Sequence, residues 1–441
     1  MRTFPFVKSA GHAAACLLAI GMALLESGGP ADAVPSFARQ TGQPCATCHV
    51  GAFGPQLTQY GREFKLNGYV WNDGNSRVPL AAMIQASLTH TSADQPGGAA
   101  PGFASNNNAA IDQASIFYGG QIFDSTGAFV QVTYDGIAKQ LTWDNLDVRY
   151  AQTGKLLGKP LLAGLTVNNN PTVQDPWNSM PAWGFPFAAS SLAPTPAAAT
   201  LADGGLAQTV LGAGGYGLWN DLVYAEADIY KGLGRDVRNA LGTVPVSGSN
   251  SYEGVIPYWR VALQHDFGNH YLELGTFGLT SKVFVGGEDN LGRADHVTDA
   301  ALDATYNYTA SADHILTGYI TYIHENQALN ESSVLLGSNA NDTLDTFRAN
   351  GSYSYQNTYT LSGQYFQTTG TPDTALYGGS PNSRGWNWEI AYVPSGKLGS
   401  WFPTYFNARL SLQYTLYDEF NGTGSHASDN NTLYLLLWLA G

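Results

Sequence analysis

Apolar and polar residues alternate along most of the chain beyond residue 79. In one segment, the apolar positions Leu302, Ala304, Tyr306 and Tyr308 interleave with Asp303, Thr305, Asn307 and Thr309. Similar alternation occurs in residues 223–230, 347–356 and 410–416. Successive side chains of a β-strand point to opposite faces, so this period predicts strands with one apolar and one polar face.

The length and chemistry of these segments favour a membrane barrel over a soluble β-sandwich, which also alternates. Each segment runs for about ten residues, the length of a tilted transmembrane strand. Tyr and Trp recur at the segment ends, and the polar face is rich in Thr, Ser, Asn and Gln, as interfacial girdles and a wet lumen require. In lipid such a sheet must close, because an open edge would leave backbone groups unsatisfied. We therefore predict an all-β outer-membrane β-barrel.

Turn signals divide this region into about sixteen strands, an even number as is usual in bacterial barrels. The expected starts are near Leu80, Ile111, Gly127, Trp143, Lys159, Gln208, Asp221, Ile256, Asn269, Val297, Asp313, Thr343, Thr358, Gly385, Thr404 and Asn430. The longest irregular stretch, residues 168–203, predicts either an extracellular loop or a loop folded into the lumen. The last strand runs past Trp438 to Gly441, although such barrels usually end on an aromatic residue.

The first 33 residues have the pattern of a secretory signal peptide. Arg2 and Lys8 precede an apolar run, residues 13–25, that is too short to span a bilayer. The sequence Ala31-Asp32-Ala33 then fits a cleavage site, with a retained anchor helix as the alternative. Cys16 lies inside the apolar run, which argues against a lipoprotein. We expect cleavage after Ala33 and a mature chain with two cysteines.

Composition excludes several classes of protein. The 441 residues include 20 Lys and Arg against 34 Asp and Glu, a net charge of −14, and no basic run, which argues against a nucleic-acid partner. Three cysteines are too few for a disulfide-stapled scaffold or a Cys-rich zinc protein. Apart from the N-terminal segment there is no long apolar run, which excludes a helical membrane protein.

The motif Cys45-Ala46-Thr47-Cys48-His49 has the C-x-x-C-H spacing that attaches a c-type haem. Each thiol bonds one vinyl group, and the imidazole reaches the iron from one side. A thioredoxin-like site would need a βαβ context, a zinc site would need a further nearby ligand, and a structural disulfide is the remaining alternative. The export signal and the histidine directly after the second cysteine favour one covalent haem c, with Cys45 and Cys48 as attachment sites and His49 as an axial ligand.

The residues around the motif predict a small haem segment, residues 34–78, ahead of a barrel domain of residues 79–441. A helix is expected from Pro55 to Gly68. Its apolar face comprises Leu57, Tyr60, Phe64 and Leu66. This face packs either on the haem plane or in an ordinary core.

Two further features of the haem segment have more than one interpretation. Arg39, Arg62 and Lys65 are candidate partners for the haem propionates, or else a solvated basic face. The second axial ligand is Met83, His90, another histidine or an open position, and a Met ligand would raise the potential relative to a second His.

The motif's surroundings resemble a known family. Residues 37–42, the sequence Gly61-Arg62-Glu63-Phe64-Lys65 with Gly68-Tyr69, and the terminal residues 431–434 with Trp438-Leu439 are similar to the fused monohaem cytochrome–porin family of iron-oxidising bacteria. The likeness covers the whole mature chain. It implies that electrons pass from extracellular Fe(II) to a periplasmic carrier, such as a soluble cytochrome or a copper protein.

The resemblance supplies no iron-binding motif, so candidate iron ligands come from chemistry. Hard carboxylate oxygens suit Fe(II), and most loop acids are simply solvated. The candidates are Glu288 with Asp289, Asp342, and Asp418 with Glu419. The leading interpretation is an outer-membrane electron conduit that oxidises Fe(II). The alternatives are a diffusion porin with a haem-bearing plug, and electron entry from another donor.

Overall fold

The computed structural model describes residues 35–71, 79–243, 250–287, 291–397 and 406–441. The predicted signal peptide, Glu288 and Asp289 lie outside these ranges. In the described part of the chain, every helix is too short or too polar to cross a bilayer.

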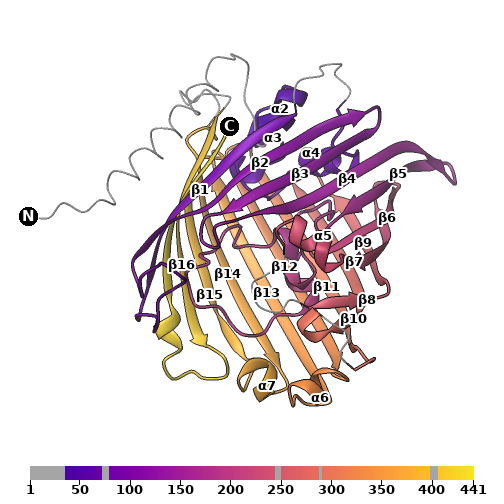
Figure 1. Ribbon diagram of the computed structural model, residues 1–441. Helices are drawn as coiled ribbons and strands as arrows, with labels where there is room; N and C mark the ends of the chain where they lie inside the picture. Colours follow the sequence, from indigo (N-terminus) through magenta and orange to yellow (C-terminus); the bar gives the residue numbers. More distant parts are fainter. Residues whose placement is uncertain (1–34, 72–78, 244–249, 288–290, 398–405) are drawn as a thin grey trace, which may run out of the picture.

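Antiparallel strands form a closed barrel (Figure 1). The strands are β1 Leu80–Thr91, β2 Asn108–Phe123, β3 Thr126–Asp135, β4 Gln140–Leu156, β5 Lys159–Asn168, β6 Val210–Trp219, β7 Val223–Gly232, β8 Ser251–Glu253, β9 Ile256–Asp266, β10 His270–Phe284, β11 Asp295–Ser311, β12 His314–Ala328, β13 Asn341–Tyr355, β14 Tyr359–Gly370, β15 Ser383–Tyr392, β16 Asn407–Glu419 and β17 Thr432–Ala440. The barrel closes where β1 pairs with β17, for example Ser87 with Leu436.

The predicted number of strands is confirmed. β8 and β9 both pair with β10 and so form one interrupted strand, which leaves sixteen positions around the ring. The expected starts differ from the observed ones by three residues at most, at β2, β4 and β16. Sequence alternation located these starts because each strand needs one lipid-facing and one lumenal set of side chains.

The direction of the alternation is that of a membrane barrel. On β11, Leu302 and Tyr306 are 61% and 42% exposed, whereas Asp303 and Thr305 are 5% and 1% exposed. Apolar side chains therefore face outward and polar ones face the interior, the reverse of a soluble sandwich. This arrangement makes the chain an outer-membrane β-barrel.

The two ends of the barrel differ in their connections. Short turns join β2 to β3, β4 to β5 and β11 to β12 at one end, whereas the connections at the other end include residues 92–107 and 169–209. Bacterial barrels have short periplasmic turns and longer extracellular loops, so the short-turn end faces the periplasm. β1 begins and β17 ends at the periplasmic end.

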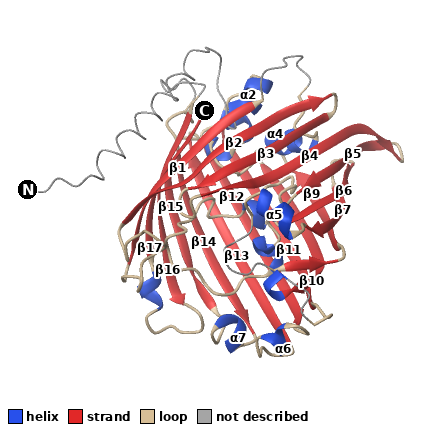
Figure 2. Cartoon of the chain, viewed as in Figure 1, coloured by secondary structure: helices blue, strands red, loops and turns tan. Residues whose placement is uncertain are grey.

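The N-terminal residues form short helices at this periplasmic end (Figures 1 and 2). They are α2 Pro35–Thr41, α3 Cys45–Cys48, the 3-10 turn η2 Val50–Ala52 and α4 Gln59–Leu66. The other helices within the described ranges are η3 Pro181–Trp183, η4 Leu201–Gly205, α5 Arg235–Ala240, η5 Val285–Gly287, α6 Ser332–Leu335, α7 Thr374–Tyr377 and η6 Ala427–Asn430. In Figure 1, α6 and α7 lie at the opposite end of the barrel from α2–α4.

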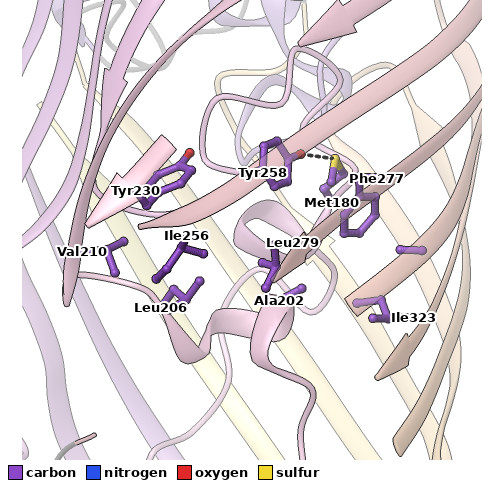
Figure 3. Packing of buried hydrophobic residues seen from close by; sticks show 11 residues of the cluster. Met180, Ala202, Leu206, Val210, Tyr230, Ile256, Tyr258, Phe277, Leu279 and Ile323 are labelled. Carbon is purple, nitrogen blue, oxygen red and sulfur yellow. Dashed lines mark hydrogen bonds between the residues drawn. The ribbon is translucent and has the colours of Figure 1, made fainter. Parts of the chain in front are cut away.

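Residues 169–209 fold into the lumen, and we call this segment the inner loop. Trp177 and Met180 on the inner loop are at most 1% exposed. Met180 packs with Tyr258 and Phe277 of the barrel wall (Figure 3). Of the two arrangements expected for this stretch, the inward one is therefore correct.

Candidate functional site

A cavity of about 410 Å³ lies inside the barrel between the N-terminal segment, the wall and the inner loop. Cofactor sites typically enclose about 300–1,000 Å³. Its lining includes Cys45, Cys48 and His49 from the motif, Met83, Phe117, Phe129 and Trp438 from the wall, and Trp183 and Phe187 from the inner loop. The motif thus contributes one side of an enclosure that three separate parts of the chain complete.

The motif places its three reactive groups on this cavity. Cys45 and Cys48 begin and end a single turn of helix, α3, and His49 follows with an extended backbone. The turn is closed by a hydrogen bond of 2.9 Å from the His49 N–H to the Cys45 carbonyl. The two thiols are not joined in a disulfide. Cys45, Cys48 and His49 therefore line the same cavity.

The environment of His49 suits a metal ligand. Burial lowers the pKa of His49 to about 4, so the imidazole is neutral at ordinary pH, and neutral imidazole is the form that binds metals. Its Nδ1 atom is buried and has no hydrogen-bond partner among the described residues. Two thiols, a neutral imidazole and an aromatic enclosure together fit a covalently attached c-type haem.

Of the candidates for the second axial ligand, Met83 lies on the cavity and His90 does not. Met83 is 9% exposed and packs with Phe117 and Phe129. His90 lies further along β1, where its exposed Nδ1 is 2.9 Å from the Asn107 side-chain oxygen. The period of a strand sends these two residues to opposite faces, because they are separated by an odd number of positions.

The three candidate propionate partners occupy different places. Lys65 lines the cavity, and its Nζ donates to the Val173 carbonyl at 2.7 Å and to Asn178 Oδ1 at 2.6 Å. Burial, reinforced by nearby Arg149, lowers the pKa of Lys65 to about 7.

The other two cations point elsewhere. The Arg62 guanidinium lies 3.7 Å from the centre of the Tyr271 ring, and Nη1 donates to the Leu57 carbonyl at 3.2 Å. Arg39 hydrogen-bonds to the Leu80 carbonyl. Because Arg62 and Lys65 are only 4% and 3% exposed, the alternative of a solvated basic face is wrong for both.

The helix after the motif begins later than expected. α4 starts at Gln59, not Pro55, because Thr58 caps it by accepting the Gly61 N–H at 3.3 Å. Its predicted apolar face is divided among three surroundings. Leu57, which precedes the helix, and Phe64 line the cavity, Tyr60 stacks on Trp71 at 4.5 Å, and Leu66 packs with Trp177 of the inner loop.

Two wall residues at this site were not predicted from the sequence as site residues. The side-chain amide of Asn407 donates to Cys45 Sγ at 3.3 Å and to the Ala52 carbonyl at 2.9 Å. Trp438 packs edge-on against Phe53 at 4.9 Å. Alternation identifies these residues only as members of a face, and barrel closure decides which of them meet the haem segment.

Gly61 sets the distance between α4 and the motif. A Cβ atom at this position would lie 2.3 Å from the Cys48 carbonyl oxygen, so Gly61→Ala must push the two segments apart. We expect a loss of about 1–3 kcal/mol in the free energy of unfolding, as for other overpacked sites, together with a perturbed haem spectrum. Chemical denaturation and visible absorption measure these effects.

Gly154→Ala is the matched control, because a Cβ atom there meets nothing within 4 Å. Equal stability and identical spectra for both variants would contradict the packing described for Gly61.

The described iron-ligand candidates lie on strands, not in the expected loops. Asp342 belongs to β13, is 3% exposed and accepts the Asn339 amide at 2.8 Å. Asp418 and Glu419 end β16, and Glu419 lies 3.5 Å from Arg384. Within the described ranges, no group of three or more His, Cys, Asp or Glu side chains is placed to hold a metal ion.

The comparisons with known proteins found similarity to solved structures alone. No protein-family model matches the chain, and no curated protein matches it.

The similar structures include outer-membrane channels of low identity. OmpF of Salmonella typhi in complex with daunomycin shows 13% identity and a TM-score of 0.46, over 84% of this chain and 99% of that one. The channel DcaP of Acinetobacter baumannii shows 10% identity and a TM-score of 0.47 over the same shares. The anion-selective porin from Comamonas acidovorans shows 12% identity and a TM-score of 0.43, over 82% of this chain and 98% of that one.

Proposed function

We propose that this protein carries electrons across the outer membrane through one covalently bound c-type haem. In this proposal the donor is extracellular Fe(II) and the acceptor is a periplasmic carrier protein, a soluble cytochrome or a copper protein, as the resemblance to the cytochrome–porin family implies. The observation that carries the proposal is the meeting of Cys45, Cys48, His49 and Met83 on one cavity inside a closed barrel.

The position of the cavity supports a conduit with two separated ends. The haem segment lies at the end with short turns, which a periplasmic carrier can approach. The inner loop lies in the lumen and contributes Trp183 and Phe187 to the cavity. An extracellular donor need not cross the membrane in this arrangement, because only its electron does.

Each described residue has a definite task in this proposal. Haem supplies a one-electron centre when it is bound. Cys45 and Cys48 would hold it covalently, and His49 would bind its iron from the motif side. Met83 is our candidate for the second iron ligand, and Lys65, in its protonated form, would supply a positive charge at the cavity wall for a propionate. The rings of Phe129 and Trp183 would form part of the apolar wall around it.

A diffusion porin with a haem-bearing plug is the second candidate, and the polar inner wall of the closed barrel favours it. Electron entry from a donor other than iron is the third. Conductance across a planar bilayer distinguishes the porin from the other two candidates. The inner loop and the haem segment both lie inside the barrel and obstruct the lumen. We expect conductance far below that of an open sixteen-stranded porin, and a conductance comparable with it supports the porin.

The direct test is reduction of the haem by Fe(II). Excess Fe(II) added without oxygen to the purified, oxidised, haem-loaded protein is expected to sharpen the reduced-state absorption bands. The His49→Ala variant removes the axial ligand and should not be reduced normally. If the wild-type protein is reduced by dithionite but stays oxidised in excess Fe(II) across the accessible pH range, iron is not the donor.

The role of Met83 is tested by the haem potential. A Met ligand raises the potential relative to a second His, so Met83→His is expected to lower it in a redox titration. Met180→Leu is the control, because Met180 lies in the inner loop away from the cavity, where its sulfur meets Arg260. An unchanged haem potential in the Met83→His variant would show that Met83 is not the axial ligand.

A further inference from the structure

A buried group of charges lies where the inner loop meets the barrel wall. It contains six carboxylates, Asp147, Asp175, Glu226, Asp228, Glu273 and Asp303, and four cations, Arg62, Lys65, Arg149 and Arg260. All ten residues are at most 5% exposed. The fully ionised group therefore carries an excess of two negative charges, and buried charge of this kind requires compensation.

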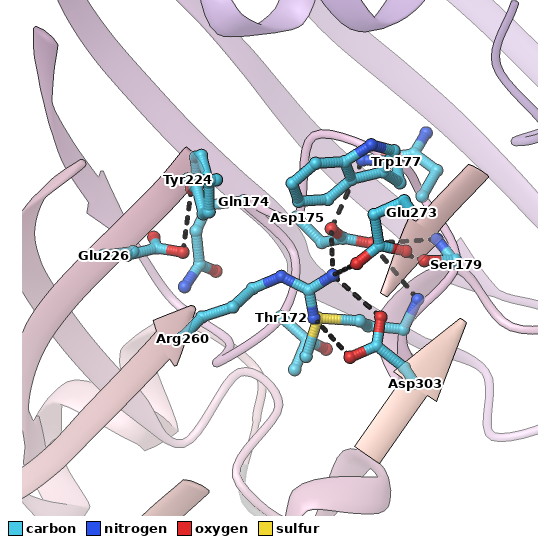
Figure 4. Close-up of polar contacts among 12 residues, drawn as sticks. Thr172, Gln174, Asp175, Trp177, Ser179, Tyr224, Glu226, Arg260, Glu273 and Asp303 are labelled. Atoms are coloured by element: carbon cyan, nitrogen blue, oxygen red, sulfur yellow. Dashed lines mark hydrogen bonds and ion pairs between the residues drawn. The ribbon is translucent and has the colours of Figure 1, made fainter. Parts of the chain in front are cut away.

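Four of the carboxylates have a cationic partner. Arg260 lies 3.0 Å from Glu273, 2.8 Å from Asp303 and 3.6 Å from Asp175 (Figure 4). Arg149 lies 2.8 Å from Asp147. In the described part of the chain, Glu226 and Asp228 form no ion pair with any cation within 4.0 Å. Glu226 and Asp228 therefore lack the direct ion pair that the other four carboxylates have.

Glu226 and Asp228 face the same point in the lumen. They are two positions apart on β7, which places both on its inner face, and their carboxyl groups lie against each other. The inner loop adds Gln174, whose Nε2 donates to Asp228 Oδ2 at 2.9 Å. Figure 4 shows Gln174 beside Glu226 and Tyr224.

Three oxygen atoms of this group have no partner. Tyr224 donates to Glu226 Oε2 at 3.0 Å, but Glu226 Oε1, Asp228 Oδ1 and Gln174 Oε1 are buried and accept no hydrogen bond from the described residues. Orphaned buried acceptors are rare in native structures and call for an unobserved ion or water. All three here are hard oxygen ligands, two of them carboxylates, the set that Ca²⁺ and Mg²⁺ prefer.

We propose that Glu226, Asp228 and Gln174 hold one hard divalent cation, of the class of Ca²⁺ or Mg²⁺. Such a cation would compensate the two carboxylates that have no ion pair and would bind the three oxygens that receive no hydrogen bond. Because Gln174 belongs to the inner loop and the carboxylates belong to β7, the cation also fastens the loop to the wall. This site is separate from the haem cavity, whose lining includes none of its three residues.

The test measures divalent metal other than haem iron in the full-length, haem-loaded protein. EDTA removes bound divalent metal from the purified protein, which is then dialysed against Ca²⁺, Mg²⁺ or Mn²⁺. Elemental mass spectrometry measures the number of metal ions bound per chain. We expect about one such ion per chain and a higher melting temperature in its presence. The double variant Glu226→Gln, Asp228→Asn should bind at least tenfold more weakly.

The control variant is Asp299→Asn, from another buried carboxyl pair. Asp299 Oδ2 and Glu325 Oε2 accept the N–H groups of Ala202 and Leu201 in the inner loop, and Gln327 donates to Glu325 Oε1. Both oxygens of Glu325 therefore have a donor, whereas each carboxylate of the proposed site has one oxygen without a donor. This variant should retain the metal. The proposal is overturned if the wild-type protein binds no metal at millimolar Ca²⁺, Mg²⁺ and Mn²⁺ and EDTA does not change its melting temperature. That result would indicate a proton shared by Glu226 and Asp228. The wild-type measurement decides even where a variant fails to fold.

Discussion

Replacing both Cys45 and Cys48 with serine is expected to abolish covalent haem attachment completely. These are the only thiols left once the predicted signal peptide is removed, and each thioether needs one of them. Peroxidase-active staining of a denaturing gel should detect haem on the wild-type chain and none on the double variant. The wall should still form, because β1 to β17 pair without help from α3.

Cys16→Ser is the matched control for this experiment. Cys16 lies in the predicted signal peptide, so this variant should stain like the wild type. Circular dichroism should show the same strand content in all three proteins. A stained double variant would show that the C-x-x-C-H motif is not the attachment site, and loss of staining in Cys16→Ser would contradict the predicted cleavage.

Arg260→Met is expected to destabilise the barrel by about 3–5 kcal/mol, the cost typical of removing one partner from a buried ion group. The Arg260 side chain is fully buried, and its guanidinium lies against three carboxylates, one of them Asp175 of the inner loop. The Met side chain fills similar space but leaves these carboxylates without their cation. Unfolding by urea or guanidinium in detergent, compared with the wild type, measures the loss.

The matched control is Arg348→Met. Arg348 also holds the inner loop, through Asp203, but its side chain is 37% exposed. Ion pairs that keep contact with solvent contribute about 0–1 kcal/mol, so this variant should unfold almost as the wild type does. Equal stability of the Arg260 and Arg348 variants would contradict a special role for the buried charges. Adding Glu273→Gln and Asp303→Asn to Arg260→Met should restore part of the loss.

The sequence by itself determined the class of the barrel and its strand count, and it contained the C-x-x-C-H motif. Alternation on β11, with Leu302 outward and Asp303 inward, is a local consequence of strand geometry and of the requirement that lipid meets apolar side chains. The C-x-x-C-H spacing is likewise local, because one turn of helix presents both thiols and the following imidazole to the same side. Such features can be read without knowing which strands are neighbours.

Only the tertiary structure decided which residues enclose the candidate site. Met83, Phe129, Trp183 and Trp438 come from distant parts of the chain and meet His49 because the barrel closes and the inner loop folds inward. Lys65 and Arg62 are both buried cations of α4, yet only Lys65 reaches the cavity, since the helix begins at Gln59 and turns Arg62 toward Tyr271. Periodicity assigns a residue to a face, whereas the residues it touches depend on strand register, barrel closure and the path of the inner loop.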